Sequence, residues 1–401
     1  MKISGLERYE TDLNRWMPRL IAVWRRRQGS RGPADRLTSP ELRQVGAAVR
    51  TLSIGLTRSR ELVGTRYMDD PRLLGAYLLF FWPVSYAQGR QVLGEIALRP
   101  RTALDLGSGP APLAFAALDA GAMEVLAADR SQAALNLARE LAVVSGESLR
   151  TRLWDLSTLK RGSEGVERYD VITIGHVLNE LFTGGSDATA RRAAMVEHAL
   201  SQLKPLGSLV LIEPALRETS RSLLRVRDVL VERGYAVRAP CFFRGNCPAL
   251  VRESDWCHAD RGWQMPRTVE EIARAAGIRK DSVKMSYLVL APKEEPWKEP
   301  PPGRVFRIIS EPLKGKGRRR YVGCGPEGRF GLALQEKHRT AANARFFDLE
   351  RGDVVAITEP EPRGDGLALT ERSAVQQIAR AGELVNAQGA PIEPFQGRPS
   401  S

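Results

Sequence analysis

The chain has 401 residues, 43% of them hydrophobic, so it can bury the cores of two or three domains. Its 60 Lys and Arg exceed its 47 Asp and Glu, and the formal net charge of +13 favours contact with a polyanion. A compositional bias toward arginine would give the same excess, so charge alone does not establish such contact. No apolar run reaches the about 18 residues of a transmembrane candidate, because the nearest, residues 76–82, ends at Pro83.

The N-terminus carries Glu7, Glu10 and Asp12 among its basic residues and has no apolar signal core. These features argue against secretion and against an acid-poor mitochondrial presequence. We therefore expect a cytoplasmic location with no membrane partner. In a reducing compartment, cysteines are more often metal ligands or reactive thiols than disulfides.

Apolar side chains recur at steps of three and four residues in the first part of the chain, which predicts a helical region over residues 1–95. The repeating residues are Leu42, Val45, Val49, Leu52 and Leu56. Arginines occupy the remaining face: Arg43, Arg50, Arg58 and Arg60. They fit a solvated helix face as well as a phosphate-binding stripe.

Apolar strands alternate with helical stretches over residues 96–295, which predicts βαβ units and a doubly wound, Rossmann-like α/β sheet. The expected strands are residues 102–105, 124–129, 169–174, 207–212, 234–238 and 285–290. A cysteine-rich insertion, 241–265, and a helix, 268–276, interrupt the last two.

Prolines at 292, 296 and 300–302 predict a linker, followed by a small, basic β-barrel over residues 300–360. Its expected strands are 305–309, 320–323, 331–334 and 353–357. Its candidate RNA-binding residues are Lys314, Lys316, Arg318, Arg319 and Arg320. Residues 361–401, rich in glycine and proline, are expected to form a flexible tail.

The segment Leu104-Asp105-Leu-Gly107-Ser-Gly109-Pro-Ala-Pro112 follows the first strand and opens a helix. Glycines let the backbone approach a ligand, and Asp129, twenty residues after Gly109, is placed to bind two ribose hydroxyls. A nicotinamide dinucleotide would require a small residue at the position of Pro112. Asp105 also suits an ammonium better than a pyrophosphate, so the pattern favours S-adenosylmethionine.

Asp155 follows the expected third strand and is placed either to meet the adenine or to cap a helix. After the fourth strand, His176-Val-Leu-Asn179-Glu180-Leu181 lies where a methyl group would be transferred. His176 is a candidate general base, and Asn179 or Glu180 would orient a substrate. The alternative is that His176 lines the pocket or caps a helix. The sequence indicates the cofactor and does not indicate the reaction.

The chain contains four cysteines, the number that one tetrahedral metal or one iron-sulfur cluster needs: Cys241, Cys247, Cys257 and Cys324. None forms a Cys-x-x-Cys pair, and their wide spacing is compatible with an all-thiolate cluster. Zinc with His258 as a ligand, or four unrelated buried thiols, are the alternatives.

Several motifs together resemble one family, over roughly residues 40–360. They are Tyr77-Leu with Pro83-Val-Ser-Tyr86, the Leu104–Gly109 loop, His176–Leu181, Leu211-Ile-Glu-Pro214, Cys241 with Cys247-Pro248, Trp256-Cys257-His258, and Arg307-Ile-Ile with Cys324. The family is the methyltransferase-like family of the mitochondrial ribosomal small subunit, with its bacterial homologues. The cysteine pattern is the most specific part of the resemblance.

The resemblance implies a class I methyltransferase fold that binds S-adenosylmethionine through Asp105, Gly107 and Gly109. It also implies a four-iron four-sulfur cluster on the four cysteines and action on the maturing ribosomal small subunit and its rRNA. We expect the protein to be a monomer when it is free and to lie in the bacterial cytoplasm. Ala111-Pro112 departs from the family pattern, in which a further glycine is frequent. Three activities stay open: methyl transfer to rRNA or a ribosomal protein, a non-catalytic RNA-binding assembly role, and a zinc-containing small-molecule methyltransferase.

Overall fold

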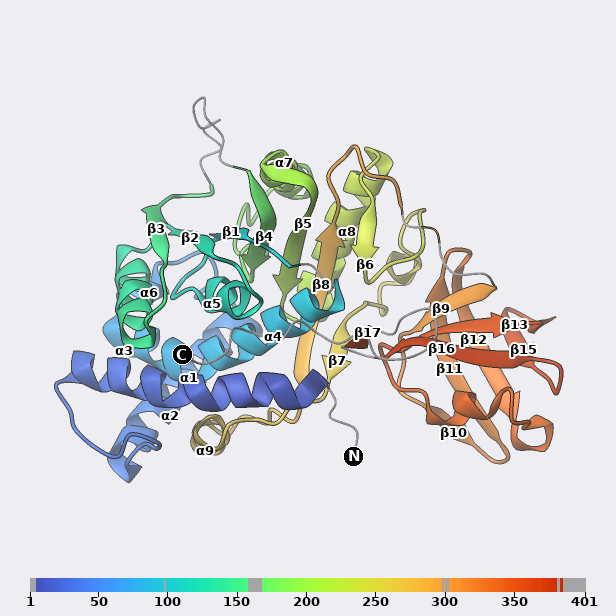
Figure 1. Ribbon diagram of the computed structural model, residues 1–401, viewed down its shortest axis with the longest axis horizontal. Coiled ribbons are helices and arrows are strands. Elements are labelled where there is room, and N and C mark those ends of the chain that lie inside the picture. The colour runs from blue at the N-terminus through green and yellow to red at the C-terminus, as the bar shows by residue number, and fades with distance from the viewer. Residues whose placement is uncertain are drawn as a thin grey trace.

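The computed structural model describes residues 5–96, 99–157, 168–297, 299, 303–380 and 383–384. The chain forms three parts in sequence order: a set of N-terminal helices, a sheet flanked by helices, and a second sheet at one end of the molecule (Figure 1). This is the predicted α/β class with an additional β-domain, residues 304–380. Within the described ranges, no helix is both long enough and apolar enough to cross a membrane.

Helices occupy most of the first 95 residues, as the apolar periodicity predicts. They are α1 (Gly5–Gln28), α2 (Ser39–Ser53), η1 (Ile54–Arg58), η2 (Tyr67–Asp69), α3 (Pro71–Ala76), η3 (Tyr77–Phe81) and α4 (Trp82–Glu95). Large rings join α1 to α4: the ring centroids of Trp16 and Trp82 lie 5.3 Å apart, and Trp82 stacks on Tyr86 at 5.2 Å. The buried rings hold the two helices together.

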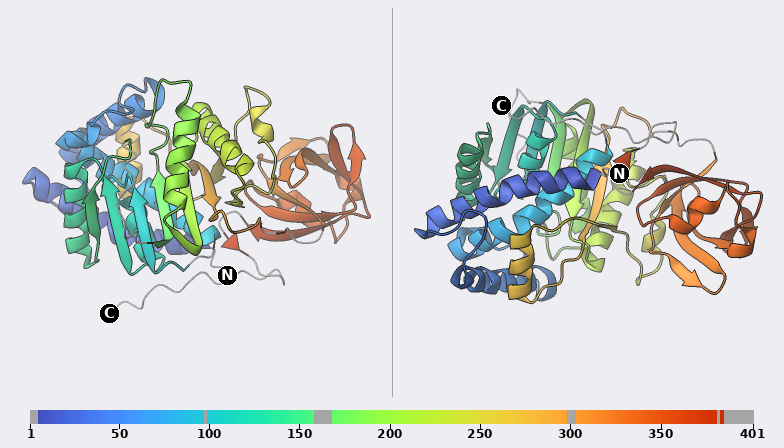
Figure 2. Two further views of the ribbon diagram at one scale, coloured as in Figure 1. Left: turned by 90° about the horizontal axis from the view of Figure 1, so that it is seen from above. Right: turned by 60° about the horizontal axis from the view of Figure 1, so that its bottom comes forward.

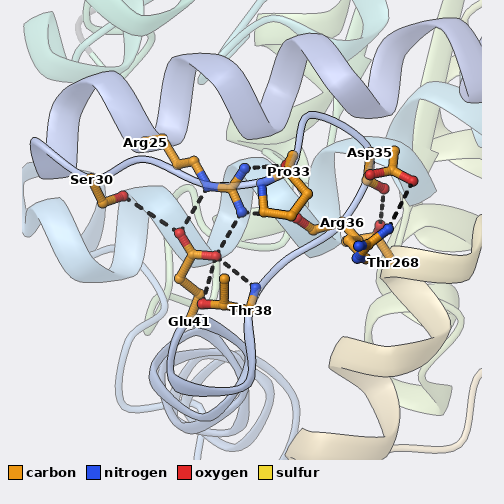
Figure 3. A network of polar contacts seen from close by, with 8 residues as sticks. All are labelled: Arg25, Ser30, Pro33, Asp35, Arg36, Thr38, Glu41 and Thr268. Atoms are coloured by element: carbon orange, nitrogen blue, oxygen red, sulfur yellow. Dashed lines mark hydrogen bonds and ion pairs between the residues drawn. The ribbon is translucent and has the colours of Figure 1, made fainter.

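A buried ion pair fixes the connection between α1 and α2 (Figure 3). Arg25 donates from Nε and Nη2 to the two carboxylate oxygens of Glu41 at 2.8 and 2.7 Å. The Glu41 carboxylate also accepts the Thr38 amide at 2.7 Å, which caps α2. These bonds, above all those from Arg25, lower the pKa of Glu41 to about 2.

Replacement of Glu41 by Gln is expected to lower the free energy of unfolding by about 2 kcal/mol at neutral pH, because Arg25 stays buried without its charged partner. Folding lowers the pKa of Glu41 from 4.5 to about 2, so the carboxylate stabilises the fold above pH 4.5 and loses this effect as the pH falls toward 2. Urea unfolding of variant and wild type at neutral pH and at about pH 3 measures the difference. An equal difference at both pH values would contradict the prediction.

Eight strands form the first sheet in the order β3-β2-β1-β4-β5-β8-β6, with β7 paired to β8. They are β1 (Thr102–Leu106), β2 (Glu124–Asp129), β3 (Arg150–Leu153), β4 (Tyr169–Gly175), β5 (Leu203–Glu213), β6 (Val237–Ala239), β7 (Ala259–Arg261) and β8 (Val283–Leu290). Neighbours from β3 to β5 are parallel, whereas β8 is antiparallel to both β5 and β6. This is the predicted Rossmann-like arrangement.

Helices cover both faces of this sheet (Figure 2). The helices that follow its strands are α5 (Pro112–Asp119), α6 (Gln132–Ser145), α7 (Ala188–Leu200), α8 (Arg217–Glu232) and α9 (Arg267–Ala276). Side chains alternate between two cores: on β1, Ala103 joins the core under α5 and α6, and Leu104 and Leu106 join the core under α7 and α8. Because helices cover both faces of the sheet, a ligand can reach it at the carboxyl ends of the parallel strands.

Nine strands form the sheet of the β-domain in the order β14-β15-β12-β11-β9-β13-β16-β17, with β10 paired to β11. They are β9 (Arg304–Ile308), β10 (Leu313–Gly315), β11 (Arg318–Gly325), β12 (Gly328–Gln335), β13 (Val354–Thr358), β14 (Glu361–Arg363), β15 (Gly366–Leu369), β16 (Ala374–Arg380) and β17 (Glu383–Leu384). Two short helices, η5 (Glu336–His338) and η6 (Ala344–Asp348), interrupt it. The sheet curls on itself (Figure 1), and within the described ranges β14 and β17 are the two ends of its strand order.

The predicted flexible tail over residues 361–401 begins too early. Residues 361–380 contribute β14, β15 and β16, and Leu367 and Leu369 enter the same core as Phe306 and Phe346. These strands are short and lie between glycines and charges, which masks their alternation in the sequence. Residues 385–401 and the linker prolines 300–302 lie outside the described residues.

Buried and half-buried charges join the β-domain to the rest of the chain. Arg307 of β9 donates to Glu95, the last residue of α4, at 2.7 Å, and to Pro240 O at 2.9 Å. Arg329 of β12 donates to Asp255 at 2.8 Å. The β-domain is therefore docked partly on residues 240–258, the segment that carries three of the cysteines.

Candidate functional site

A cavity opens at the carboxyl ends of β1 and β4, where the order of the parallel strands reverses. In open α/β sheets, ligands bind at this switch point. The cavity measures about 930 Å³ including the solvent at its mouth, and we refer to it as the cofactor pocket. It is lined by all five predicted cofactor-binding residues and two predicted catalytic ones: Asp105, Gly107, Gly109, Asp129, Asp155, His176 and Glu180.

The loop between β1 and α5 meets the pocket with its backbone. Gly107 and Gly109 have φ angles of +68° and +53°, which residues with a Cβ rarely adopt. A Cβ on Gly107 would lie 2.3 Å from Val177 Cγ2, so no side chain fits there. Asp129 at the end of β2 accepts the Gly109 amide at 2.7 Å and the Ser131 amide at 2.7 Å. These bonds hold its carboxylate beside the loop.

Asp105 lies beneath the loop and is 2% exposed. Its carboxylate accepts the Thr173 hydroxyl at 2.7 Å and the Ala114 amide at 3.0 Å. Burial raises the pKa of Asp105 to about 7. Direct contact with a ligand ammonium would compete with these two bonds, which tie the start of α5 to β4.

Ala111, at the departure from the family pattern, is fully buried and has the left-handed angles φ 63° and ψ 38°. Since this conformation strains alanine by roughly 1 kcal/mol relative to glycine, Ala111→Gly is expected to raise the free energy of unfolding by up to about that amount. Ala114→Gly, inside α5, is the matched control and should destabilise the fold by about 1 kcal/mol or more. Urea unfolding measures both, and equal destabilisation would show that Ala111 is not strained.

Asp155 follows β3 and lines the cofactor pocket beside Trp154. Its carboxylate accepts the Ser157 amide at 2.9 Å and the Ser157 hydroxyl at 2.7 Å, which lowers the pKa of Asp155. Asp155 therefore caps the turn that follows β3. Its contact with an adenine remains a prediction.

His176 follows β4 in a left-handed backbone conformation, with φ at +61°. Its Nε2 lies 2.8 Å from Gln88 Oε1. Because the Gln88 amide nitrogen donates to Lys284 O at 3.0 Å, the Gln88 oxygen accepts from His176 Nε2. Burial lowers the pKa of His176 to about 4, so the ring is neutral at pH 7 and Nδ1 is its acceptor.

The other two candidates on this motif face different cavities. Asn179 donates to His176 O at 3.0 Å and lines a second cavity outside the cofactor pocket. Glu180 lines the cofactor pocket, where it accepts the Tyr67 hydroxyl at 3.3 Å and the Gly64 amide at 3.4 Å. Burial raises the pKa of Glu180 to about 7.

Residues 64–69, which sequence reasoning missed, form one rim of the cofactor pocket. Arg130 donates to the carbonyls of Gly64 and Thr65 at 3.1 and 2.6 Å, and the Ser131 hydroxyl donates to Asp69 at 2.8 Å. The only signal in the sequence is a turn-forming stretch between two helices. No local pattern indicates that it packs against β2 and its following turn.

The four cysteines come from two parts of the chain. Cys241, Cys247 and Cys257 lie between β6 and β7, in a segment whose only regular element is η4 (Pro248–Leu250), and Cys324 lies on β11. None of the four forms a disulfide. Burial raises their pKa values, and neighbouring cysteines raise the pKa further for Cys247, to about 12, for Cys257, to about 11, and for Cys324. The thiols are thus close enough to influence one another.

Arginines hold the cysteine segment in place. Arg221 of α8 donates to the carbonyls of Ala249, Arg252 and Asp255 at 3.0, 2.8 and 2.7 Å. Arg227, also on α8, donates to the carbonyls of Phe243 and Gly245. Its charge lowers the pKa of Cys241 against the effect of burial.

A metal at this site would have to be bound by the four cysteine thiolates. Cys241 and Cys257 line a cavity at the junction with the β-domain, together with Arg307 and Arg351. In the parts of the chain that the structure describes, no group of three or more His, Cys, Asp or Glu is arranged to hold a metal ion. The metal site expected from the four cysteines therefore remains a prediction.

A family model matches residues 73–355, more than two thirds of the chain. Its description is mitochondrial small ribosomal subunit Rsm22. The chain belongs to the Rsm22 family. The matched range runs from α3 into β13 and includes the glycine loop and all four cysteines. No curated protein matches the chain.

Solved methyltransferase structures share part of the architecture. The N-methyltransferase NodS from Bradyrhizobium japonicum, in complex with S-adenosyl-L-homocysteine, is 12% identical, with 62% of this chain and 100% of NodS covered and a TM-score of 0.35. The putative RNA methyltransferase PH1948 from Pyrococcus horikoshii is 13% identical, with 53% and 83% covered and a TM-score of 0.33. Neither likeness is close enough to carry a functional argument.

The predicted RNA-binding residues of this Rsm22-family chain lie on the β10–β11 ribbon, in which Gly315 pairs with Arg318. Lys316, Arg318 and Arg320 are exposed, and Arg319 is partly buried. The side chain of Lys314 lies outside the described residues. The ribbon thus presents at least three cations to solvent.

Proposed function

We propose that the protein binds S-adenosylmethionine in the cofactor pocket and acts on the RNA of the maturing ribosomal small subunit. The observation that carries the proposal is the convergence of the glycine loop, Asp129 and Asp155 at the β1/β4 switch point of an Rsm22-family chain. In this proposal Asp129 accepts the ribose hydroxyls and Asp155 lies at the adenine. When bound, S-adenosylmethionine supplies a methyl group to a nucleophile.

The pocket also suits the positive charge of that cofactor. Asp105 and Glu180 are buried carboxyl groups whose pKa values burial raises to about 7. A cation beside them would favour their ionised forms and offset part of the burial. The two carboxyl groups would therefore gain negative charge when a cation binds beside them.

We further propose Glu180, rather than His176, as the group that accepts a proton from a substrate. A general base works best when its pKa lies near the working pH, and this describes Glu180. His176, with its pKa at about 4, is a weak base that is held by Gln88. His176 would then shape the pocket, which is the alternative that the sequence left open.

A non-catalytic role in assembly is the second candidate, and the rim of the pocket favours it. Both Glu180 oxygens already accept protein donors, Tyr67 and Gly64, and this would hinder contact with a substrate. Methyl incorporation into immature small subunits separates the two roles. If the wild type restores subunit maturation without any methyl incorporation, and Glu180→Gln restores it equally well, the enzymatic role fails and the assembly role stands.

Gly107→Arg tests whether the pocket holds the cofactor. We expect it to abolish binding of S-adenosylhomocysteine in calorimetry, because even a Cβ at this position meets Val177. Gly262→Arg is the matched control, since a Cβ there meets no atom within 4 Å and the residue lies outside the pocket. Undiminished binding by folded Gly107→Arg protein would place the ligand elsewhere.

We propose that Cys241, Cys247, Cys257 and Cys324 hold a four-iron four-sulfur cluster. A single zinc ion needs its ligands about 2.3 Å from one point, whereas a cluster binds each thiolate at a different iron and so needs a wider set. Arg227 and Arg307 supply positive charge that would offset the negative charge of the thiolates. The zinc-containing small-molecule methyltransferase is the alternative, and metal analysis of the purified protein separates the two.

We propose that the β10–β11 ribbon contacts RNA phosphates. Changing Lys316, Arg318 and Arg320 together to Gln is expected to weaken binding of single-stranded RNA and to reduce its salt dependence by about 0.7 per lost phosphate contact. The charge-matched control changes the exposed residues Arg267, Arg274 and Arg279 of the α9 region to Gln. Fluorescence anisotropy over a salt series measures the RNA affinity of both variants. Equal losses of affinity would show that the ribbon contributes only through the overall charge of the surface.

A further inference from the structure

A second cavity lies on the other side of the His176–Leu181 motif from the cofactor pocket. It measures about 850 Å³ including the solvent at its mouth. Its wall includes Arg60, Asn179, Phe182, Arg192, Thr219 and Ser222. The motif separates the two cavities, because Asn179 lines this one and its neighbour Glu180 lines the cofactor pocket. A ligand in the second cavity would therefore lie next to the transfer position.

Two arginines in this cavity, Arg60 and Arg192, have no carboxylate partner among the residues that the structure describes. Arg60 donates to Leu56 O at 3.3 Å and to the carbonyl and side-chain oxygens of Asn179 at 3.2 and 3.3 Å. Arg192 donates to Leu181 O at 3.1 and 2.8 Å and to the Ser222 hydroxyl at 2.7 Å. Neither forms an ion pair with the residues that the structure describes. Since a guanidinium has five N–H donors, each keeps two of them without an acceptor in that part of the chain.

The surroundings of the two arginines leave their charge poorly compensated. Burial lowers the pKa of Arg192, and the nearby charge of Arg60 lowers it further. Glu213 and Glu218 act in the opposite direction. Glu213 is buried behind the motif with its own pKa raised by burial to about 8, and Glu218 is exposed and lines the same cavity. Two like charges are thus held in one cavity, and an anion between them would relieve their repulsion.

Two residues of the cavity wall have a strained backbone conformation. Arg60 and Phe182 have φ angles of +57° and +54°, which are uncommon for residues other than glycine. Strain of this kind persists where the surrounding structure requires a particular side-chain position. Helix α7 begins at this wall with Ala188, and Thr219 lies in the first turn of α8 (Arg217–Glu232); the amino ends of helices favour a negative group.

We propose that this cavity binds a backbone phosphate of the RNA on which the cofactor pocket acts. Planar guanidinium groups donate in pairs to phosphate oxygens, and Arg60 and Arg192 approach the cavity from separate elements. The proposal rests on the proposed RNA substrate and adds where its backbone is held. RNA is favoured over an acidic peptide because the exposed β10–β11 ribbon is also basic.

The experiment compares two double variants that remove the same charge. One is Arg60→Gln with Arg192→Gln. The other is Arg58→Gln with Arg225→Gln, two exposed arginines on neighbouring elements outside the cavity. With a short single-stranded RNA as probe, we expect the first to weaken binding roughly tenfold and to reduce the salt slope by about 0.7, and the second to change neither measurably. Binding of S-adenosylhomocysteine should be unchanged in both.

A third variant separates phosphate binding from a structural role. Arg60→Lys with Arg192→Lys keeps both charges and should retain most of the RNA affinity, whereas a loss equal to that of the Gln variant would overturn the proposal. So would equal effects of the two Gln variants, while the proposed function would stand. If the wild-type protein binds RNA without salt dependence or not at all, the proposed function itself fails. The proposal of an RNA phosphate in the second cavity then fails as well.

Discussion

Glu95→Gln is expected to lower the free energy of unfolding by about 3–5 kcal/mol, because it leaves two buried guanidinium groups without their carboxylate. Glu95 accepts Arg307 at 2.7 Å through one oxygen, and Arg261 and the Tyr287 hydroxyl, at 2.7 Å, through the other. Burial would raise its pKa, yet Arg307 and Arg261 lower the pKa of Glu95 to about 2. The ionised carboxylate is thus required for the joint between α4 and the β-domain.

Urea unfolding, followed by tryptophan fluorescence, measures this loss. The matched control is Glu299→Gln, which removes an exposed partner of Arg244 and should leave the free energy within about 0.5 kcal/mol. The folded pKa of Glu95 lies below its usual value of 4.5, so its stabilising effect is present above pH 4.5 and is lost as the pH falls toward 2. The free energies of unfolding of the variant and the wild type should therefore approach each other as the pH falls toward 2. Equal losses in Glu95→Gln and the control would show that the joint does not depend on this charge.

Local patterns predicted the parts of the site that a single strand-turn-helix unit builds. The glycine loop and Asp129 belong to adjacent parallel strands, so their spacing in the sequence already places them at one edge of the sheet. Asp155 follows β3, which pairs with β2, and the His176 motif follows β4, which pairs with β1, so they lie at the same edge. Each prediction of location used only the period of the strands and the rule that their carboxyl ends meet.

The remaining contacts join distant residues and left no local pattern. Tyr67 reaches Glu180 and Arg307 reaches Glu95 across the fold, and such ion pairs depend on the docking of whole elements. The roles within the motif were likewise undecided by sequence: burial, which is a tertiary property, separates the pKa of His176 from that of Glu180. The strands of residues 361–380 were missed because pairing with β12 and β13, rather than their own composition, orders them.

Cys324→Ser is expected to remove a resident iron-sulfur cluster and to loosen the β-domain. Cys324 lies on β11 between Arg307 of β9 and Arg329 of β12, the two residues that dock the domain on Glu95 and Asp255. A cluster held by Cys324 and by the three cysteines of the 241–257 segment would link the same two surfaces covalently. Its binding free energy would then contribute to docking as well as to folding.

Anaerobic purification followed by iron, sulfide and zinc analysis measures the cluster. We expect about four iron atoms per chain in the wild type and close to none in Cys324→Ser. His258→Ala is the control, since His258 would be a ligand only in the zinc alternative, and its main-chain oxygen would still accept from Arg351. The control should keep its iron. Zinc without iron in wild-type protein never exposed to oxygen would overturn the cluster. Iron that persists in Cys324→Ser would remove Cys324 from the ligand set, and the joint would then depend on the arginines alone.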